Sequence, residues 1–72
     1  MKKTSFTIEF DQETDGRWIA AVLQLPGVLC YGESQEEAQA KAEALALRVV
    51  ADQLEQGEKT ADLASVEFSF VS

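Results

Sequence analysis

Apolar and polar residues alternate near the start of the chain with the period of a half-buried β-strand. The alternation runs through residues 6–11, where apolar side chains occupy the even positions. Asp15-Gly16 then offers a residue that accepts positive φ, so we predict a hairpin turn there. Residues 17–23 form the returning strand, and both of its faces are apolar. Such a strand is typical of the centre of a sheet, partly covered on both sides.

Turn residues separate two further strands from this hairpin. Leu25-Pro26-Gly27 ends the pairing, because proline presets φ and glycine accepts the φ that other residues avoid. Residues 28–31 are then a short third strand, and Gly32-Glu33 allows the chain to turn. The polar residues 58–64 predict a loop, and alternation over residues 66–70 predicts a fourth strand.

A single long helix is predicted over residues 35–56. Ser34 and Glu37 have the spacing of a capping box, in which each side chain binds a backbone amide near the other. Gly57 is suited to end the helix in the left-handed conformation. At ~1.5 Å per residue the helix is about 33 Å long, whereas a strand of about seven residues spans only ~23 Å. We therefore expect the helix to extend beyond the sheet.

Together these elements predict an α+β fold in the order β-β-β-α-β, formed by a single domain over residues 1–72. The first three strands are expected to form an antiparallel meander. The fourth follows the helix through a right-handed crossover, so it should run in the same direction as the third.

The predicted helix carries more apolar surface than one sheet can cover. At about 100° per residue, two apolar stripes lie nearly opposite each other. The first comprises Ala38, Ala42, Leu45 and Val49, and the second comprises Ala40, Ala44, Leu47, Ala51 and Leu54. A helix on one sheet needs one stripe, so the second predicts contact with a subunit or partner. The alternative is that alanines are simply good helix formers.

The small size of the chain also favours self-association into a dimer or tetramer. With 72 residues and one cysteine, the chain has a small core and no internal disulfide to support it. The candidate residues of an oligomer interface are Leu47, Ala51, Leu54, Phe68 and Phe70.

The formal net charge of −7 indicates which classes of macromolecule the chain is expected to bind. An acidic surface repels phosphate backbones, so we expect no direct binding of nucleic acid. It favours a basic protein partner, although the charge can also serve only to keep the domain soluble.

Acidic residues recur at every second position from Glu9 to Asp15, and they would line one face if the strand continued into the turn. Such a row can dock Lys and Arg of another protein, hold a hard metal ion, or simply be solvated. The candidate partner-binding residues are Glu9, Asp11, Glu13, Asp15 and, as an aromatic anchor, Tyr31.

Residue types needed for catalysis are missing from the sequence. It has no histidine, which excludes histidine-dependent mechanisms and the usual zinc sites. The segment from Gly27 to Gly32 lacks the spacing and the lysine of a phosphate loop. Cys30 falls in a predicted strand, where a buried and inert thiol is expected. We therefore predict a protein that is not an enzyme and that carries no metal or cofactor.

Apolar runs in the sequence are short. None is long enough for a membrane span, and the N-terminus has no continuous apolar stretch of the kind that signal peptides contain. A cytoplasmic location is therefore expected.

Several short motifs occur in a fixed order along the chain. They are Asp15-Gly16-Arg17-Trp18-Ile19-Ala20, Leu25-Pro26-Gly27-Val28, Tyr31-Gly32, Ser34-Gln35-Glu36-Glu37-Ala38 and the run over residues 44–52. In this order and spacing, over residues 6–71, the chain resembles the HicB family of small antitoxins. The resemblance implies a partial ribonuclease-H-like fold without nuclease activity. It also implies the neutralisation of HicA, a small basic toxin that cleaves mRNA with a histidine.

Two features depart from the family pattern. Family members often carry a C-terminal DNA-binding domain, whereas this sequence ends at Ser72 directly after the fourth predicted strand. We therefore expect no operator binding by the chain itself. Position 24 is Gln where the family pattern has proline, and we expect a looser bend there.

The leading hypothesis is a protein-binding antitoxin that neutralises a HicA-like toxin. The alternative is a stand-alone, oligomeric HicB-like domain without a toxin partner, acting as a scaffold or binding a small ligand. A metal-dependent hydrolase is a third class, and it would require carboxylates that converge on one site.

Overall fold

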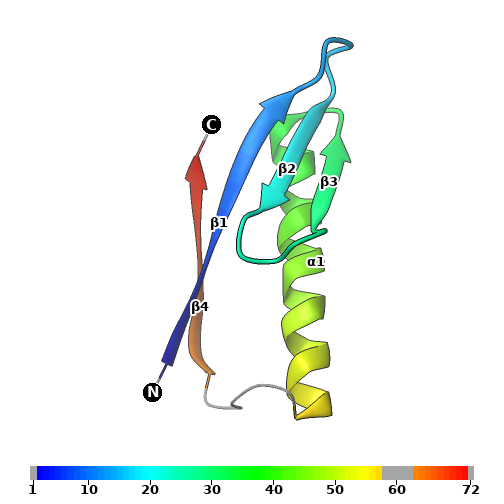
Figure 1. Ribbon diagram of the computed structural model, residues 1–72. Coiled ribbons are helices and arrows are strands. Elements are labelled where there is room, and N and C mark those ends of the chain that lie inside the picture. Colours follow the sequence, from blue (N-terminus) through cyan, green and yellow to red (C-terminus); the bar gives the residue numbers. More distant parts are fainter. Residues whose placement is uncertain (1, 58–62, 72) are drawn as a thin grey trace.

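Four strands and one helix follow one another in the predicted order (Figure 1). The computed structural model describes residues 2–57 and 63–71 of the chain. Its elements are β1 (Lys2–Gln12), β2 (Trp18–Val22), β3 (Leu29–Gly32), α1 (Gln35–Gln56) and β4 (Leu63–Val71). The α+β class and the order β-β-β-α-β are therefore confirmed.

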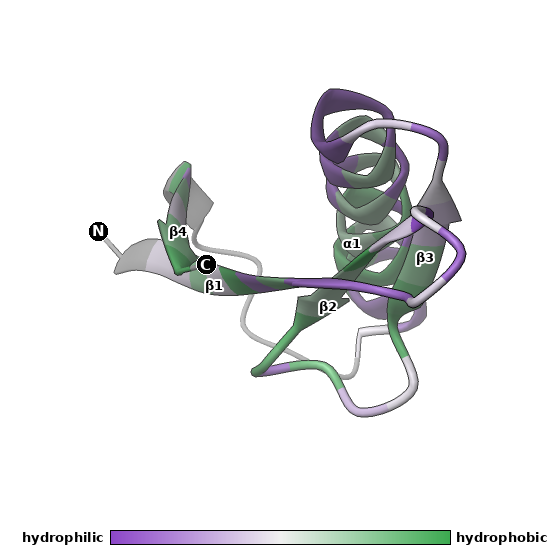
Figure 2. Ribbon diagram, turned by 90° about the horizontal axis from the view of Figure 1, so that it is seen from above, coloured by the Kyte–Doolittle hydropathy of each residue, from purple (hydrophilic) through white to green (hydrophobic). Residues whose placement is uncertain are grey.

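The four strands form one mixed sheet in the order β3-β2-β1-β4. β1 pairs antiparallel with β2, and β2 with β3, which is the predicted meander. β4 pairs parallel with β1. As a result, β3 and β4 lie at opposite edges of the sheet and run in the same direction, as predicted. α1 packs on one face of the sheet, mainly over β2 and β3 (Figure 2).

The largest errors in the predicted boundaries concern the starts of the first and fourth strands. β4 begins at Leu63, so the predicted loop is wrong for residues 63 and 64, while residues 58–62 lie outside the described residues. β1 likewise begins at Lys2, before the alternating segment, and Lys2 pairs with Leu63. Parallel pairing therefore extends both strands beyond the segments that the sequence pattern predicts. β2 and β3 differ from the prediction by one residue at each end.

Two turns between the strands form as predicted. Gly16 has a φ of 96° in the β1–β2 hairpin, where its amide donates to the carbonyl three residues earlier at 2.9 Å. Gly27 has a φ of 89°, and the Val28 amide donates to the Leu25 carbonyl at 3.1 Å. With Pro26 before Gly27, this is the pattern of a type II turn.

α1 begins and ends at the predicted residues. The Ser34 hydroxyl accepts the Glu37 amide at 3.1 Å, and the Glu37 carboxylate accepts the Glu33 amide at 2.7 Å. Gly57 has a φ of 72°, and its amide donates to carbonyls of the last turn. The C-terminal half of α1 extends beyond β2 and β3, but β1 and β4 continue toward the same end of the molecule, so the helix extends beyond two strands and not beyond the whole sheet as predicted (Figure 1).

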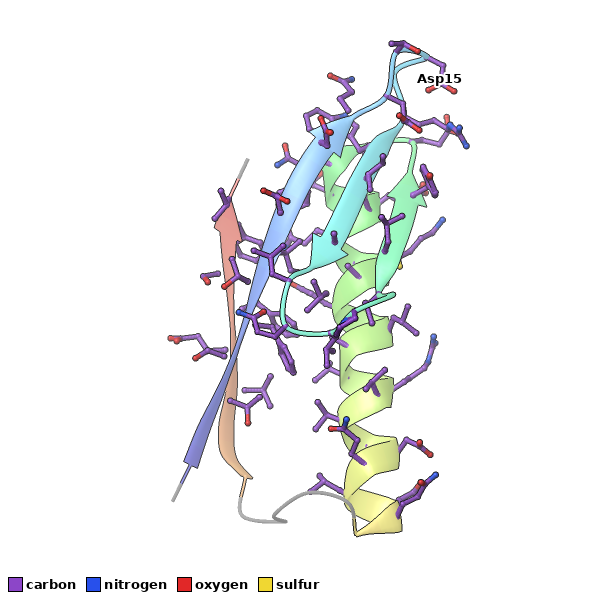
Figure 3. The ribbon with its side chains drawn as sticks, viewed as in Figure 1. Asp15 is labelled. Carbon is purple, nitrogen blue, oxygen red and sulfur yellow. The ribbon has the colours of Figure 1, made fainter. Side chains whose placement is uncertain are left out.

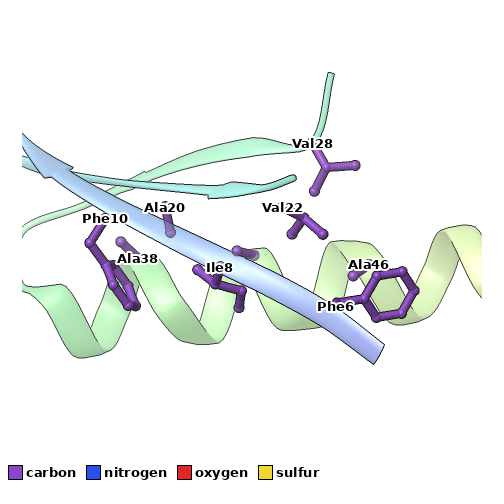
Figure 4. Packing of buried hydrophobic residues seen from close by; sticks show 9 residues of the cluster. Phe6, Ile8, Phe10, Ala20, Val22, Val28, Ala38 and Ala46 are labelled. Atoms are coloured by element: carbon purple, nitrogen blue, oxygen red, sulfur yellow. The ribbon is translucent and has the colours of Figure 1, made fainter. Parts of the chain in front are cut away.

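The core lies between α1 and the face of the sheet that it covers. The rings of Phe6 and Phe68 stack with their centroids 5.7 Å apart, and those of Phe10 and Phe70 are 6.0 Å apart. β4 therefore joins the core through aromatic contacts with β1. The buried residues are Phe6, Ile8, Phe10, Ala20, Val22, Val28, Ala38, Ala42 and Ala46 (Figure 4).

Trp18 and Cys30 are half-buried and pack against this core. The Cys30 thiol is free, and it is less buried than the sequence predicts. The reason is that β3 is an edge strand, so no further strand covers its outer side.

Candidate protein-binding surface

The face of the sheet that points away from α1 has no described element packed over it (Figure 2). Residues that alternate with the buried ones project from this face. Strand register places them in rows across the sheet: one row is Asp11, Ile19 and Tyr31, and the next is Glu9, Ala21 and Leu29. We call these six residues the outer face. Carboxylates from β1 thus lie beside apolar side chains from β2 and β3.

The side chains of the outer face at β1 and β3 are open to solvent. Leu29 and Tyr31 are 47% and 43% exposed, and Glu9 and Asp11 are also exposed. An apolar centre with charges at its margin is the usual composition of a protein–protein interface. The outer face can therefore bind a protein whose own surface combines apolar and basic residues.

The predicted row of four acids is divided in the structure. Glu9 and Asp11 lie in β1, but β1 ends at Gln12. Glu13 and Asp15 follow in the hairpin loop, where alternation no longer applies, and Asp15 lies at the tip of the molecule (Figure 3). The structure therefore brings Glu9 and Asp11 together with Tyr31 on one face, and it separates Glu13 and Asp15 from them.

Arg17 binds the Asp15 carboxylate in the hairpin loop and also contacts Tyr31 on β3. The Asp15 carboxylate accepts the backbone amide and the Nε of Arg17, both at 3.0 Å. The backbone hydrogen bond, together with the positive charge of Arg17, holds the pKa of Asp15 below its usual value. The Arg17 guanidinium also lies 5.0 Å from the centroid of the Tyr31 ring, in a cation–π contact. Asp15 and Arg17 thus help to hold Tyr31 in place.

Gln24 anchors the loop between β2 and β3 to β1. Its side-chain oxygen accepts the Thr7 amide at 2.7 Å, and its side-chain nitrogen donates to the Thr7 hydroxyl at 3.1 Å. The Leu23 amide donates to the Thr7 carbonyl at 3.0 Å, directly after the end of β2. The Gln24 side-chain oxygen accepts the Thr7 amide in place of a backbone carbonyl, and so completes the pairing at this end of β2. These hydrogen bonds hold the bend against β1, and the effect of glutamine in place of proline stays a prediction.

The five candidate residues of the oligomer interface lie on the other side of the sheet from the outer face. Leu47 and Phe70 are 45% and 48% exposed, and Ala51 is exposed as well. Leu54 and Phe68 are half-buried. These residues belong to α1 and β4.

Sequence reasoning predicted Tyr31 but missed Ile19, Ala21 and Leu29, the other apolar residues of the outer face. The alternation over residues 17–23 contains part of the signal, because it places Ile19 and Ala21 on one side of the strand. Only the pairing of β2 with β3 brings Leu29 beside Ala21 and Tyr31 beside Ile19. That register is not encoded in any local pattern.

Within the described part of the chain, no three His, Cys, Asp or Glu side chains are grouped so that they could hold a metal ion. No helix among these residues has both the length and the apolar character needed to cross a bilayer. Comparisons of the chain with protein-family models, with curated proteins and with solved structures gave no match.

Proposed function

We propose that this protein is a HicB-like antitoxin, which binds and neutralises a small basic HicA-like toxin that cleaves mRNA in the cytoplasm. The observation that carries the proposal is the outer face, where Glu9 and Asp11 on β1 share one face of the sheet with the exposed Leu29 and Tyr31 on β3, across Ala21 and Ile19 of β2. The apolar side chains supply contact area for a partner, and the carboxylates attract and orient a basic one.

Charge and sequence resemblance support the same proposal. A net charge of −7 gives the chain a long-range attraction for basic proteins and a repulsion for RNA. The resemblance to HicB antitoxins covers residues 6–71, and the observed order β-β-β-α-β is the one that it implies. The finer assignment, a partial ribonuclease-H-like fold, is part of the proposal.

This protein would inhibit the toxin by covering the basic surface with which the toxin binds RNA. A toxin that cleaves mRNA must bind phosphate groups with basic residues. An acidic protein face that binds the same residues excludes the RNA, and it needs no catalytic group of its own. This mechanism requires only that Glu9, Asp11, Leu29 and Tyr31 reach the partner together.

The test is a binding and inhibition assay with the product of the neighbouring gene. We expect a small basic protein that stops growth when it is expressed alone and that cleaves mRNA in vitro. One equivalent of this chain should restore growth and stop cleavage, and binding should weaken as salt rises. A neighbouring product that neither binds nor is toxic would contradict the proposal and favour the stand-alone scaffold.

Matched charge reversals locate the binding surface. Glu9→Lys and Glu55→Lys change the net charge equally, but Glu9 lies on the outer face and Glu55 lies on α1. We expect Glu9→Lys to weaken toxin binding by about tenfold or more, since opposing like charges costs upward of ~1.4 kcal/mol. Glu55→Lys should leave the affinity nearly unchanged. Equal losses in both variants would mean that net charge, and not this face, determines binding.

A further inference from the structure

The outer face divides along the direction of its strands into an apolar part and an acidic part. The apolar part belongs to β2 and β3, and its residues are Ile19, Ala21, Leu29 and Tyr31. We call these four residues the apolar half. β1 comes next across the sheet and presents Glu9 and Asp11 on the same face. The apolar residues therefore form a band with carboxylates along one side.

The apolar half has the width of one helix. Two strands about 4.8 Å apart cover about 10 Å together with their side chains, and an α-helix with its side chains is ~10–12 Å across. Leu23 is 53% exposed and lengthens the band, because its amide donates to the Thr7 carbonyl and so continues the pairing of β2 with β1. Three such rows, ~6.8 Å apart, extend over about 14 Å, which is the length of about nine helical residues.

The rest of the outer face is unsuited to a partner sheet. Such a sheet would also cover β1 and β4, because two sheets pack face to face over several strands. Apart from Val71, the residues on this side of β1 and β4 are polar or acidic, and they are Ser5, Thr7, Glu9, Asp11, Glu67 and Ser69. Covering them without new hydrogen bonds would cost free energy. A helix that follows β2 and β3 leaves β4 in water.

Glu9 and Asp11 determine the charge of the helix that can bind here. Their positions on β1 are ~6.8 Å apart, and residues four positions apart on a helix are ~6 Å apart along its axis. Lys or Arg at two such positions can therefore face both carboxylates, provided that the helix runs along the strands. The helix of a second copy is unsuited, because α1 has only Lys41 and Arg48 against five acidic residues.

Arg17 bounds the apolar half at the hairpin end. Its Nε lies 3.0 Å from the Asp15 carboxylate, and its guanidinium lies 5.0 Å from the centroid of the Tyr31 ring. Because Asp15 offsets this charge, a basic helix meets an ion pair here and not a single cation. At the other end, the connection between β2 and β3 projects on the side of the sheet opposite α1 (Figure 2). The contact therefore lies between these two features.

We propose that the protein partner places one amphipathic helix on the apolar half, with its axis along β2 and β3. Apolar residues at a spacing of three and four positions cover the apolar half. Lys or Arg residues four positions apart, on the flank toward β1, bind Glu9 and Asp11. The sheet then lies between α1 and the helix of the partner, in three layers. This inference rests on the proposed function only in that the outer face binds a basic protein.

The first test uses two synthetic peptides of about fourteen residues, made of leucine and lysine in the same proportions. In one peptide the leucines recur at the helical spacing, and in the other they alternate with lysine as in a strand. We expect the helical peptide to bind the isotope-labelled chain about tenfold more tightly. In nuclear magnetic resonance spectra, it should shift the amide signals of the apolar half and not those of α1.

Three outcomes of the peptide test would overturn the inference. They are binding of the alternating peptide that is as tight as that of the helical one, binding of the helical peptide to α1, and no binding of either peptide. The toxin is absent from this experiment. A neighbouring gene product that fails to bind would therefore contradict the proposed function without deciding this test.

The second test uses matched serine variants to locate the helix across the sheet. Leu29 and Val71 lie in one row of the outer face and are 47% and 49% exposed, but Leu29 is on β3 and Val71 is on β4. These strands are ~14 Å apart, which is more than the diameter of a helix. We expect Leu29→Ser to weaken binding of the helical peptide about tenfold, and Val71→Ser to leave it unchanged. Equal losses, or no loss in Leu29→Ser, would overturn the inference.

Discussion

Gly32 is a position at which β3 and the start of α1 come close together. A Cβ at this position would lie 3.0 Å from the Glu37 carbonyl carbon and closer still to the backbone of Ala38. The sequence suggested only that Gly32 allows the chain to turn. The structure gives a different reason, since a side chain here would strike the backbone of the first helical turn. Five residues lie between Gly32 and Ala38, and no local pattern predicts that their backbones meet.

We expect Gly32→Ala to destabilise the fold by about 1–3 kcal/mol, the usual cost of overpacking a rigid contact. The contact is with backbone, so no side-chain movement can relieve it. Urea unfolding of this variant measures the loss. Gly57→Ala is the control, because nothing lies within 4 Å of the added Cβ and only its left-handed φ costs energy, about 1 kcal/mol. A Gly32→Ala variant as stable as the natural protein would contradict the proposed role.

Among the elements, those set by local signals were predicted best. α1 has the predicted ends because its capping residues and its terminal glycine lie next to it in sequence. The start of β4 was missed because it depends on pairing with the first residues of β1, which are about sixty positions away. The outer face was likewise predicted where a local pattern determines it and missed where strand pairing does. Alternation predicted Glu9 and Asp11, whereas the register of β2 and β3 determines which apolar residues lie beside them.

The connection between β2 and β3 offers a test at the scale of an element. Gln24→Ala removes both side-chain hydrogen bonds to Thr7, and we expect a loss of ~1 kcal/mol in the free energy of unfolding. Faster amide exchange at Thr7 should accompany it, because that amide loses its acceptor. Gln56→Ala, which removes only hydrogen bonds to Asp52 within α1, is the control and should leave Thr7 unchanged. Unaltered exchange at Thr7 in Gln24→Ala would show that the loop does not depend on this side chain.

For the whole molecule, the predicted oligomer interface on α1 and β4 and the outer face lie on opposite sides of one sheet. Association of two copies through Leu47 and Phe70 would leave the outer face of each copy free for a basic partner. The forces also differ, since the first contact is apolar and the second combines apolar and charged groups. Self-association should therefore change little with salt, while partner binding weakens.

This arrangement predicts that the two associations can be separated. A dimer formed through the predicted interface on α1 and β4 would keep the outer face of each copy free, so each dimer should bind two toxin molecules. We expect Leu47→Glu to give a complex of one chain with one toxin, and Glu9→Lys to remain a dimer that binds toxin about tenfold more weakly. Titration calorimetry gives the stoichiometry and affinity, and light scattering gives the mass of each complex. If Leu47→Glu abolished toxin binding while staying folded, the toxin site would include both copies, and the outer face of one sheet would not be sufficient.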